Sequence, residues 1–353
     1  MRKAGRSLEV ITVTQSSQGS ERKCLRDYKL SRIDGLKLKI DKPSFKYGKA
    51  FHDIQARYFG GATIEQCIDY MELVQLPMMP EDDRKGYAGL IKGYFSKTEE
   101  GKPYGLHRRD QSLYFPEVRI EVPFIAGRKQ KMHGVILKGV IDLIAYDYYD
   151  REGERMYYAC LVDHKTSTRK MDLTLRQWSF QLYYYRLLFT TAVAIYRDRK
   201  KLRKQSSSLL KGFSIDPPEA ITDDLIERMM EPEPRLVYNY AIKSQAKKTE
   251  PVYTPDKYQL IQVPKHNKEL EAFMNIRIER HVARIREAKR FDRWPQEPLS
   301  CYDEASKFSE CQFYSKCVMH DDSKYVVGDP WGELRQARGE SEASNFFSAE
   351  NGG

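Results

Sequence analysis

The sequence contains no long apolar run. No continuous apolar segment reaches the roughly 18 residues that a membrane-spanning helix requires. The first 20 residues carry basic side chains without a continuous apolar core, which makes a poor secretory signal. We therefore expect a cytoplasmic protein with no membrane partner.

Three further features are scarce or missing. The phosphate-binding pattern G-x-x-x-x-G-K-[ST] does not occur, so no nucleotide-driven motor is predicted in this chain. There are six cysteines in 353 residues, whereas disulfide-stapled scaffolds are shorter and denser in cysteine. No internal repeat is visible. These absences favour a globular protein of one large domain or two smaller ones.

Positive charge is plentiful and unevenly placed. The formal net charge is +10, and residues 1–49 hold 13 Lys/Arg against 5 Asp/Glu. A second basic cluster, "RDRKKLRK", covers 197–204, whereas residues 321–353 hold 3 Lys/Arg against 7 Asp/Glu. Such clustering fits a polyanionic partner, but it fits an ordinary solvated surface equally well.

Apolar periodicity predicts helices first, then strands, and then helices and strands in turn. Helices are expected at 43–61, over most of 62–115, and at 173–197 and 267–290, and strands at 117–125, 134–149, 156–164, 234–242 and 258–264. This order favours an α/β or α+β core. We expect five segments: a flexible N-terminus (1–20), a helical region (21–116), a core (117–265), a C-terminal helix with a cysteine cluster (266–320) and a disordered tail (321–353).

Two aspartates end neighbouring predicted strands. Asp142 closes "GVID" and Asp163 closes "CLVD", and a hairpin between the strands brings the two carboxylates together. Such carboxylates repel each other unless a cation lies between them, and Mg²⁺ prefers oxygen ligands of this kind. Lys165 follows Asp163 by two residues, on the same face of an extended strand and about 7 Å along it. The pattern predicts a Mg²⁺ or Mn²⁺ site with a lysine that orients water, although a bare D-x-K also occurs on surface hairpins.

Two predicted helices carry polar residues that could join this site. His52 lies one turn after Gly48 on the helix at 43–61, although a lone histidine on a helix is more often structural. Gln177, Gln181 and Tyr185 are spaced four residues apart on the helix at 173–197, so they share one face. We interpret that face as directed at DNA, with a core helix as the alternative.

Taken together, these motifs resemble the RecB-like branch of the PD-(D/E)XK nucleases. The resemblance rests on Gly48 and His52, Glu121, "GVID", "VDHK" and "QLYYY", in that order and spacing, over roughly residues 20–320. Each motif is weak alone, but the ordered set is specific. The resemblance implies an α/β, restriction-endonuclease-like core with a central mixed sheet flanked by helices, a helical region before it and a cysteine-cluster segment after it.

The resemblance also assigns roles to individual residues. By analogy with the family, His52, Asp142 and Asp163 hold the metal ion together with the backbone carbonyl of His164, and Lys165 serves the attacking water. Gln181 and Tyr185 match the Q-x-x-x-Y motif, which is thought to contact DNA and support the site. Glu121 is either an outer metal ligand or an acid on the strand surface.

The late cysteines suggest a second metal site. Cys301, Cys311 and Cys317 lie within 17 residues, and Cys24 lies far upstream. Thiolates bind Zn²⁺ and iron–sulfur clusters. Iron–sulfur nucleases of the branch that the chain resembles use one early and three late cysteines, so the resemblance favours a 4Fe–4S cluster, with Zn²⁺ next and free thiols third. The usual late spacing is C-x2-C-x5-C, and this chain departs from it with a nine-residue gap. Cys67 and Cys160 are expected in the core.

The predicted function is metal-dependent exonucleolytic hydrolysis of DNA, from single-stranded or duplex ends, as in phage-type recombination. The chain would act alone, as an oligomer, or beside a helicase or a single-strand annealing protein. Two alternatives stay open: a CRISPR spacer-trimming nuclease, and a catalytically silent iron–sulfur subunit that binds DNA.

Overall fold

The structure, a computed structural model, describes residues 10–17, 24–38, 43–110, 112–124, 134–168, 170, 180–197, 219–231, 233–243, 253–264, 268–295, 313, 316–317, 322–323 and 325–327. The chain forms two compact units. The first comprises Met1–Asp41, Glu121–Val140 and Ala272–Gly353, and the second comprises Lys42–Ile120 and Ile141–Glu271. None of the helices in the described ranges is long and apolar enough to cross a bilayer.

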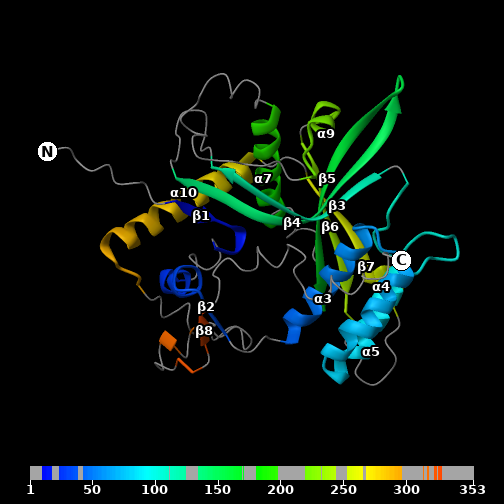
Figure 1. The fold of residues 1–353 in the computed structure, drawn as a ribbon, viewed down its shortest axis with the longest axis horizontal. Helices are drawn as coiled ribbons and strands as arrows, with labels where there is room; N and C mark the ends of the chain where they lie inside the picture. The colour runs from blue at the N-terminus through cyan, green and yellow to red at the C-terminus, as the bar shows by residue number, and fades with distance from the viewer. Residues whose placement is uncertain are drawn as a thin grey trace, which may run out of the picture. The chain divides into compact units, whose positions relative to one another are not determined.

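The second unit is built around a mixed sheet (Figure 1). Its strands are the first part of β3 (Ser112–Pro123), the last part of β4 (Val135–Arg151) and all of β5 (Glu154–Ser167), β6 (Arg235–Ile242) and β7 (Tyr258–Val263). Strand β4 pairs antiparallel with β5, β5 parallel with β6, and β6 antiparallel with β7. The short turn η4 (Pro255–Lys257) leads into β7. Aromatic and β-branched residues dominate these strands because such side chains pack well on a pleated surface.

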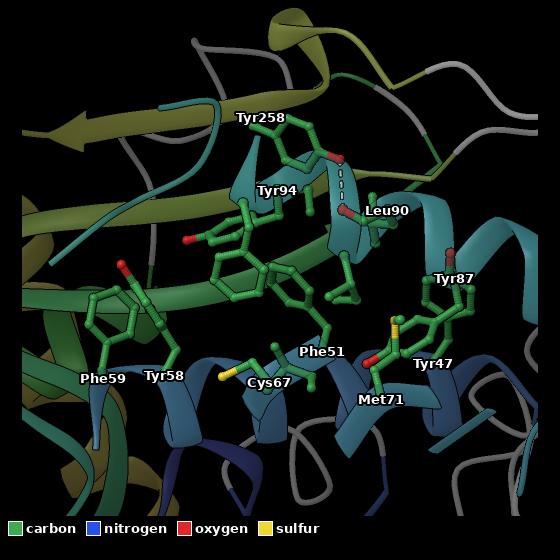
Figure 2. Close-up of a cluster of buried hydrophobic side chains, with 14 of the residues drawn as sticks. Tyr47, Phe51, Tyr58, Phe59, Cys67, Met71, Tyr87, Leu90, Tyr94 and Tyr258 are labelled. Carbon is green, nitrogen blue, oxygen red and sulfur yellow. Dashed lines mark hydrogen bonds between the residues drawn. The ribbon is translucent and has the colours of Figure 1, made fainter. Parts of the chain in front are cut away.

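Three helices cover one face of this sheet, namely α3 (Pro43–Phe59), α4 (Ile64–Tyr70) and α5 (Glu81–Phe95), with the turns η2 (Met71–Gln75) and η3 (Leu76–Met78) before α5. Figure 2 shows the aromatic core that fills the space around them. Phe51, Tyr87 and Tyr94 are fully buried there and pack with Leu143 and Val162 of the sheet. Burial of such large side chains contributes roughly 1.5–3 kcal/mol each, so this layer holds α3 firmly on the strands.

The opposite face of the sheet is covered by α7 (Phe180–Arg197), which packs against β5 and β6. A parallel strand pair needs a crossover connection, and α7 lies within the segment that links β5 to β6. The half of the helix that follows Gln181 is mostly apolar and buried, and the short helix α9 (Asp223–Glu227) packs beside it. The guanidinium of Arg186 pairs with Glu233 at 2.6 Å and with Glu271 at 2.5 Å.

The first unit contains shorter elements and one long helix: β1 (Ile11–Val13), α2 (Leu25–Tyr28), η1 (Lys29–Ile33), β2 (Leu36–Leu38), most of α10 (Lys268–Phe291) and β8 (Tyr325–Val327). Strand β1 pairs parallel with the start of β4, and β2 pairs antiparallel with β8. The ring of Tyr28 contacts the rings of His281 and Trp294, with centroids 5.4 Å and 6.5 Å away.

The predicted fold class, an α/β chain with a central mixed sheet flanked by helices, is confirmed. The order at the chain ends differs from the prediction. Strand β1 lies within the segment predicted to be flexible, because Ile11 and Val13 are buried against β4. Strand β8 lies within the predicted disordered tail, because the ring of Tyr325 stacks on Phe313. Over 62–115, predicted to be mostly helical with a loop at 97–110, the last helix is α5, which ends at Phe95, and no helix follows it up to 110.

Candidate active site

Strands β4 and β5 bring the two predicted acids together. The described ladder ends with Leu143 opposite Val162, so the next two residues, Asp142 and Asp163, follow at the same end of the hairpin. The backbone N–H of His164 donates a hydrogen bond to Oδ2 of Asp142 at 2.9 Å. The main chain of β5 therefore fixes one acid while the side chain of Asp163 supplies the other.

Lys165 and Asp163 share one face of β5, as predicted from their spacing. The Lys165 Nζ lies 3.0 Å from Oδ1 and 2.9 Å from Oδ2 of Asp163. The amide of Gln181, at the start of α7, donates to Oδ1 of Asp163 at 2.8 Å and lies 2.9 Å from the hydroxyl of Tyr185. Because Asp163 is fully buried, its carboxylate needs such polar neighbours in place of water.

Helix α3 places His52 on the other side of Asp142. Its Nδ1 lies 3.3 Å from Oδ2 of Asp142. Gly48, one turn earlier, faces β5, and a Cβ there would make an ordinary van der Waals contact with Thr166 Oγ1 at 3.7 Å. The imidazole of His164 lies 6.0 Å from that of His52, centroid to centroid, and stacks on Phe59 at 5.9 Å. The side chain of His164 thus belongs to the aromatic layer, and only its backbone faces the acids.

Burial makes both acids hard to ionise in the metal-free protein. Desolvation raises the pKa of Asp142 to about 6, and the ammonium of Lys165 and the His164 N–H oppose part of that rise. Desolvation raises the pKa of Asp163 to about 7, with Lys165 again lowering it and the charge of Asp142 raising it further. The charge of Asp142 disfavours ionisation of Asp163, whereas a hydrogen bond from the side chain of Asp163 lowers the pKa of Asp142. A bound cation would favour the ionised form of both acids.

The surroundings shift the pKa values of the two bases, His52 and Lys165, in opposite directions. Desolvation and the charge of Lys165 lower the pKa of His52 to about 4, so its imidazole is neutral and able to ligate at neutral pH. Burial lowers the pKa of Lys165, but the charges of Asp163 and Asp142 outweigh burial and leave it raised. Burial and the two acids raise the pKa of Tyr185 well above its usual value. Lys165 is therefore a cation, and Tyr185 is a neutral hydroxyl.

The geometry fits a hard divalent cation with few protein ligands. Among the described residues, no group of three or more His, Cys, Asp or Glu side chains stands ready to enclose a metal ion. Mg²⁺ needs only one or two carboxylates because it keeps several waters and takes substrate phosphate oxygens. Asp142, Asp163 and the carbonyl of His164 can supply such a partial set, and the ammonium of Lys165 contacts both oxygens of Asp163.

Two glutamates of β3, Glu121 and Glu117, have different contacts. Glu121, a predicted outer ligand or surface acid, pairs with Lys138 at 2.5 Å within the first unit. Glu117, which the sequence reasoning missed, has a φ of 51° and its charge raises the pKa of Asp142. A non-glycine residue with positive φ inside a strand often marks a re-aimed side chain. The signal in the sequence was Pro116, because proline interrupts a strand ladder.

The predicted cysteine ligands are only partly described. Cys24 is buried just before α2, with its Sγ 3.8 Å from the carbonyl oxygen of Pro295. Cys317 is half-buried and packs against the small cluster of Leu30, Phe313 and Tyr325. Cys301 and Cys311 lie outside the described residues. Cys67 is fully buried in the aromatic core, and Cys160 is partly buried beside it, as predicted.

Comparison with known families decides the affiliation. The profile described as the PD-(D/E)XK nuclease superfamily matches residues 12–317. The chain belongs to the PD-(D/E)XK nuclease superfamily. No curated protein sequence matches it. As a member of this superfamily the chain is a nucleic-acid hydrolase, and its α/β architecture is that of a PD-(D/E)XK nuclease-like core.

Within this nuclease, the structure gathers most of the predicted site into the second unit. The side chains brought together there are those of His52, Asp142, Asp163, Lys165, Gln181 and Tyr185, with the backbone of His164 between them. They come from α3, β4, β5 and α7, which are far apart in sequence. The roles predicted for these residues are therefore chemically compatible with their positions.

Proposed function

We propose that this nuclease hydrolyses DNA from its ends, with Mg²⁺ or Mn²⁺ as the cofactor. The observation that carries the proposal is the pair of acids, the partly buried Asp142 and the fully buried Asp163, in contact with the neutral imidazole of His52 and the ammonium of Lys165 respectively. In this proposal Asp142, Asp163, His52 and the carbonyl of His164 hold the cation. Glu121 is left as an outer acid, since its described partner is Lys138.

Each residue then has a definite task in the reaction. When bound, the metal ion supplies a water of lowered pKa and neutralises charge on the phosphate. Lys165 keeps its proton, orients the attacking water and offsets the negative charge that develops on the phosphoryl oxygens. Gln181 holds the carboxylate of Asp163 in one orientation through its 2.8 Å hydrogen bond. Tyr185 keeps its hydroxyl hydrogen and can donate it to a DNA phosphate.

The end-directed specificity follows from the resemblance of the motif set to the RecB-like branch. A phage-type recombination exonuclease is our first assignment, working alone, as an oligomer, or beside a helicase or a single-strand annealing protein. The formal net charge of +10 supports a DNA substrate, because positive charge gives a sequence-independent attraction to phosphates.

Incubation with two forms of one plasmid tests the proposal. With Mn²⁺ or Mg²⁺ we expect the linear form, labelled at either the 5′ or the 3′ end, to be degraded progressively, while the covalently closed circle stays intact. EDTA should stop the reaction, and Asp163→Asn prepared in parallel should show none. Cutting of the closed circle would indicate an endonuclease instead, and absence of hydrolysis with both metals would indicate the silent DNA-binding subunit.

We also propose that Cys24, Cys301, Cys311 and Cys317 bind a 4Fe–4S cluster. Support comes from the thiol donor set and from the buried position of Cys24. Anaerobically purified protein should be brown, with a broad absorption band at about 400 nm from thiolate-to-iron charge transfer. Cys24→Ser should lose the band, whereas Cys67→Ser should keep it. A colourless protein that contains zinc would show that these cysteines bind Zn²⁺ and not an iron–sulfur cluster.

A further inference from the structure

A buried polar chain lies behind the acids, on the sheet face that α3 and α5 cover. Asn239 of β6 stands opposite His164 of β5 in the parallel ladder, and the two residues are 0 % and 2 % exposed. The Asn239 Nδ2 lies 2.8 Å from His164 Nδ1 and 2.7 Å from the hydroxyl oxygen of Tyr94. The Tyr94 hydroxyl in turn donates to the carbonyl of Leu106 at 3.0 Å.

The hydroxyl of Tyr94 sets the direction of the hydrogen bonds in the series Tyr94, Asn239 and His164. Because the hydroxyl hydrogen of Tyr94 goes to Leu106, the Tyr94 oxygen accepts from Asn239. The amide of Asn239 has two hydrogens, so the second one is donated to His164 Nδ1. In that assignment the imidazole hydrogen of His164 is on Nε2, which is buried and has no hydrogen-bond partner among the described residues.

The hydrogen-bonded side chains of Tyr94, Asn239 and His164 have apolar surroundings, so burying their polar atoms there costs free energy. Phe59 stacks on the imidazole of His164, and Phe51 meets it edge-on at 6.4 Å. An aliphatic pair at 164 and 239 would suit this aromatic layer (Figure 2) and would leave no polar atom to satisfy. The hydrogen bond between Asn239 and His164 therefore specifies the orientation of the His164 side chain, which packing alone would not specify.

The orientation that it specifies is that of the main chain between the acids. His164 has its side chain in the aromatic layer, while its N–H bonds Asp142 and its neighbours Asp163 and Lys165 face α7. Because Asn239 holds the imidazole from the neighbouring strand, residue 164 and its N–H keep a fixed position in β5 relative to β6. We infer that Asn239 is a positioning residue, which clamps His164 so that the two acids are held ready for a divalent cation. This inference rests on the proposed metal-dependent function.

Mn²⁺ binding measured without DNA tests the inference. Asn239→Leu should weaken binding about tenfold in isothermal titration calorimetry, since loss of a supporting contact behind metal ligands typically costs 10–100-fold. The amide hydrogen of His164 should also exchange faster with solvent, because its bond to Asp142 loosens. The kcat should fall with little change in KM for DNA.

A matched control separates positioning from general stability. Tyr258→Phe removes a hydrogen bond of the same layer, from the hydroxyl to the carbonyl of Leu90 at 2.7 Å (Figure 2), and keeps the ring that contacts Tyr94 at 5.7 Å, so every hydrogen bond of the His164 chain remains. It should reduce thermal stability but leave Mn²⁺ affinity within about twofold of wild type. Asn239→Ser, whose hydroxyl is too short to reach His164, gives the same test if the leucine variant does not fold.

Two outcomes overturn the inference. One is an Asn239 variant that binds Mn²⁺ as wild type does, and the other is unchanged exchange of the His164 amide. If the wild-type protein itself binds no Mn²⁺ and hydrolyses no DNA, the proposed function fails, and the amide exchange still decides whether Asn239 orders the main chain at His164.

Discussion

Lys165→Met should reduce DNA hydrolysis by about 10²–10⁴-fold while leaving Mn²⁺ binding as tight as in wild type or tighter. Methionine keeps the length and the alkyl stem of lysine but carries no charge. In the metal-free protein the ammonium lies within 3.0 Å of both carboxylate oxygens of Asp163, so an incoming cation must displace it. Removing the ammonium removes this competitor for the carboxylate and also the group that orients water.

The measurement pairs single-turnover hydrolysis of end-labelled DNA with Mn²⁺ calorimetry at pH 8. Lys92→Met is the matched control, because Lys92 pairs with Glu72 at 2.7 Å and is half exposed. An exposed pair of this kind contributes roughly 0–1 kcal/mol, so the control should hydrolyse DNA within about twofold of wild type. A rate for Lys165→Met within tenfold of wild type would show that Lys165 does not act in the reaction. Loss of Mn²⁺ binding would instead make it a structural partner of Asp163.

The sheet and the central acids could be predicted from the sequence because their signals are local. The runs that contain Asp142 and Asp163 are long, β-rich and joined by the short turn around Gly153, so hairpin pairing follows directly. Both strands continue past these acids, which were predicted to end them. Alternation along a strand then places Lys165 beside Asp163. The helical spacing of Gln181 and Tyr185 likewise predicted that both share a face, and the structure has them in contact.

Other parts of the site depend on contacts that no local pattern reveals. Asn239 and Tyr94 are 145 residues apart in the chain, yet they form one hydrogen bond beneath His164. Glu117 lies near enough to Asp142 to raise its pKa and has a positive φ, and a strand pattern predicts neither. Glu121 stood out by its motif, but its described partner is Lys138. Strands β1 and β8 are three residues each, too short for periodicity to show.

The acids that serve the reaction should also weaken the metal-free fold, so Asp142→Asn should be more stable than wild type in EDTA at pH 8. Asparagine keeps an oxygen that can accept the His164 N–H, and it removes a buried negative charge beside Asp163. The pKa of Asp142 rises from 3.8 to about 6 on folding, chiefly through burial. Since one pKa unit corresponds to about 1.4 kcal/mol, we expect a gain on the order of 1–3 kcal/mol.

The sign of the pH dependence identifies the cause. A carboxyl whose pKa is raised on folding stabilises the folded state when protonated, and this contribution is lost as pH rises from about 4 through about 6. Chemical denaturation in EDTA should therefore show the two proteins alike at pH 4 and diverging up to pH 8. Asp224→Asn, which alters an exposed pair with Arg228, should differ little from wild type at every pH. Saturating Mn²⁺ should reverse the order, because only wild-type protein has both carboxylates with which to bind it, and binding to the folded state raises its stability. A variant that is less stable than wild type at pH 8 in EDTA would show that Asp142 is a structural acid rather than one held ready for a cation.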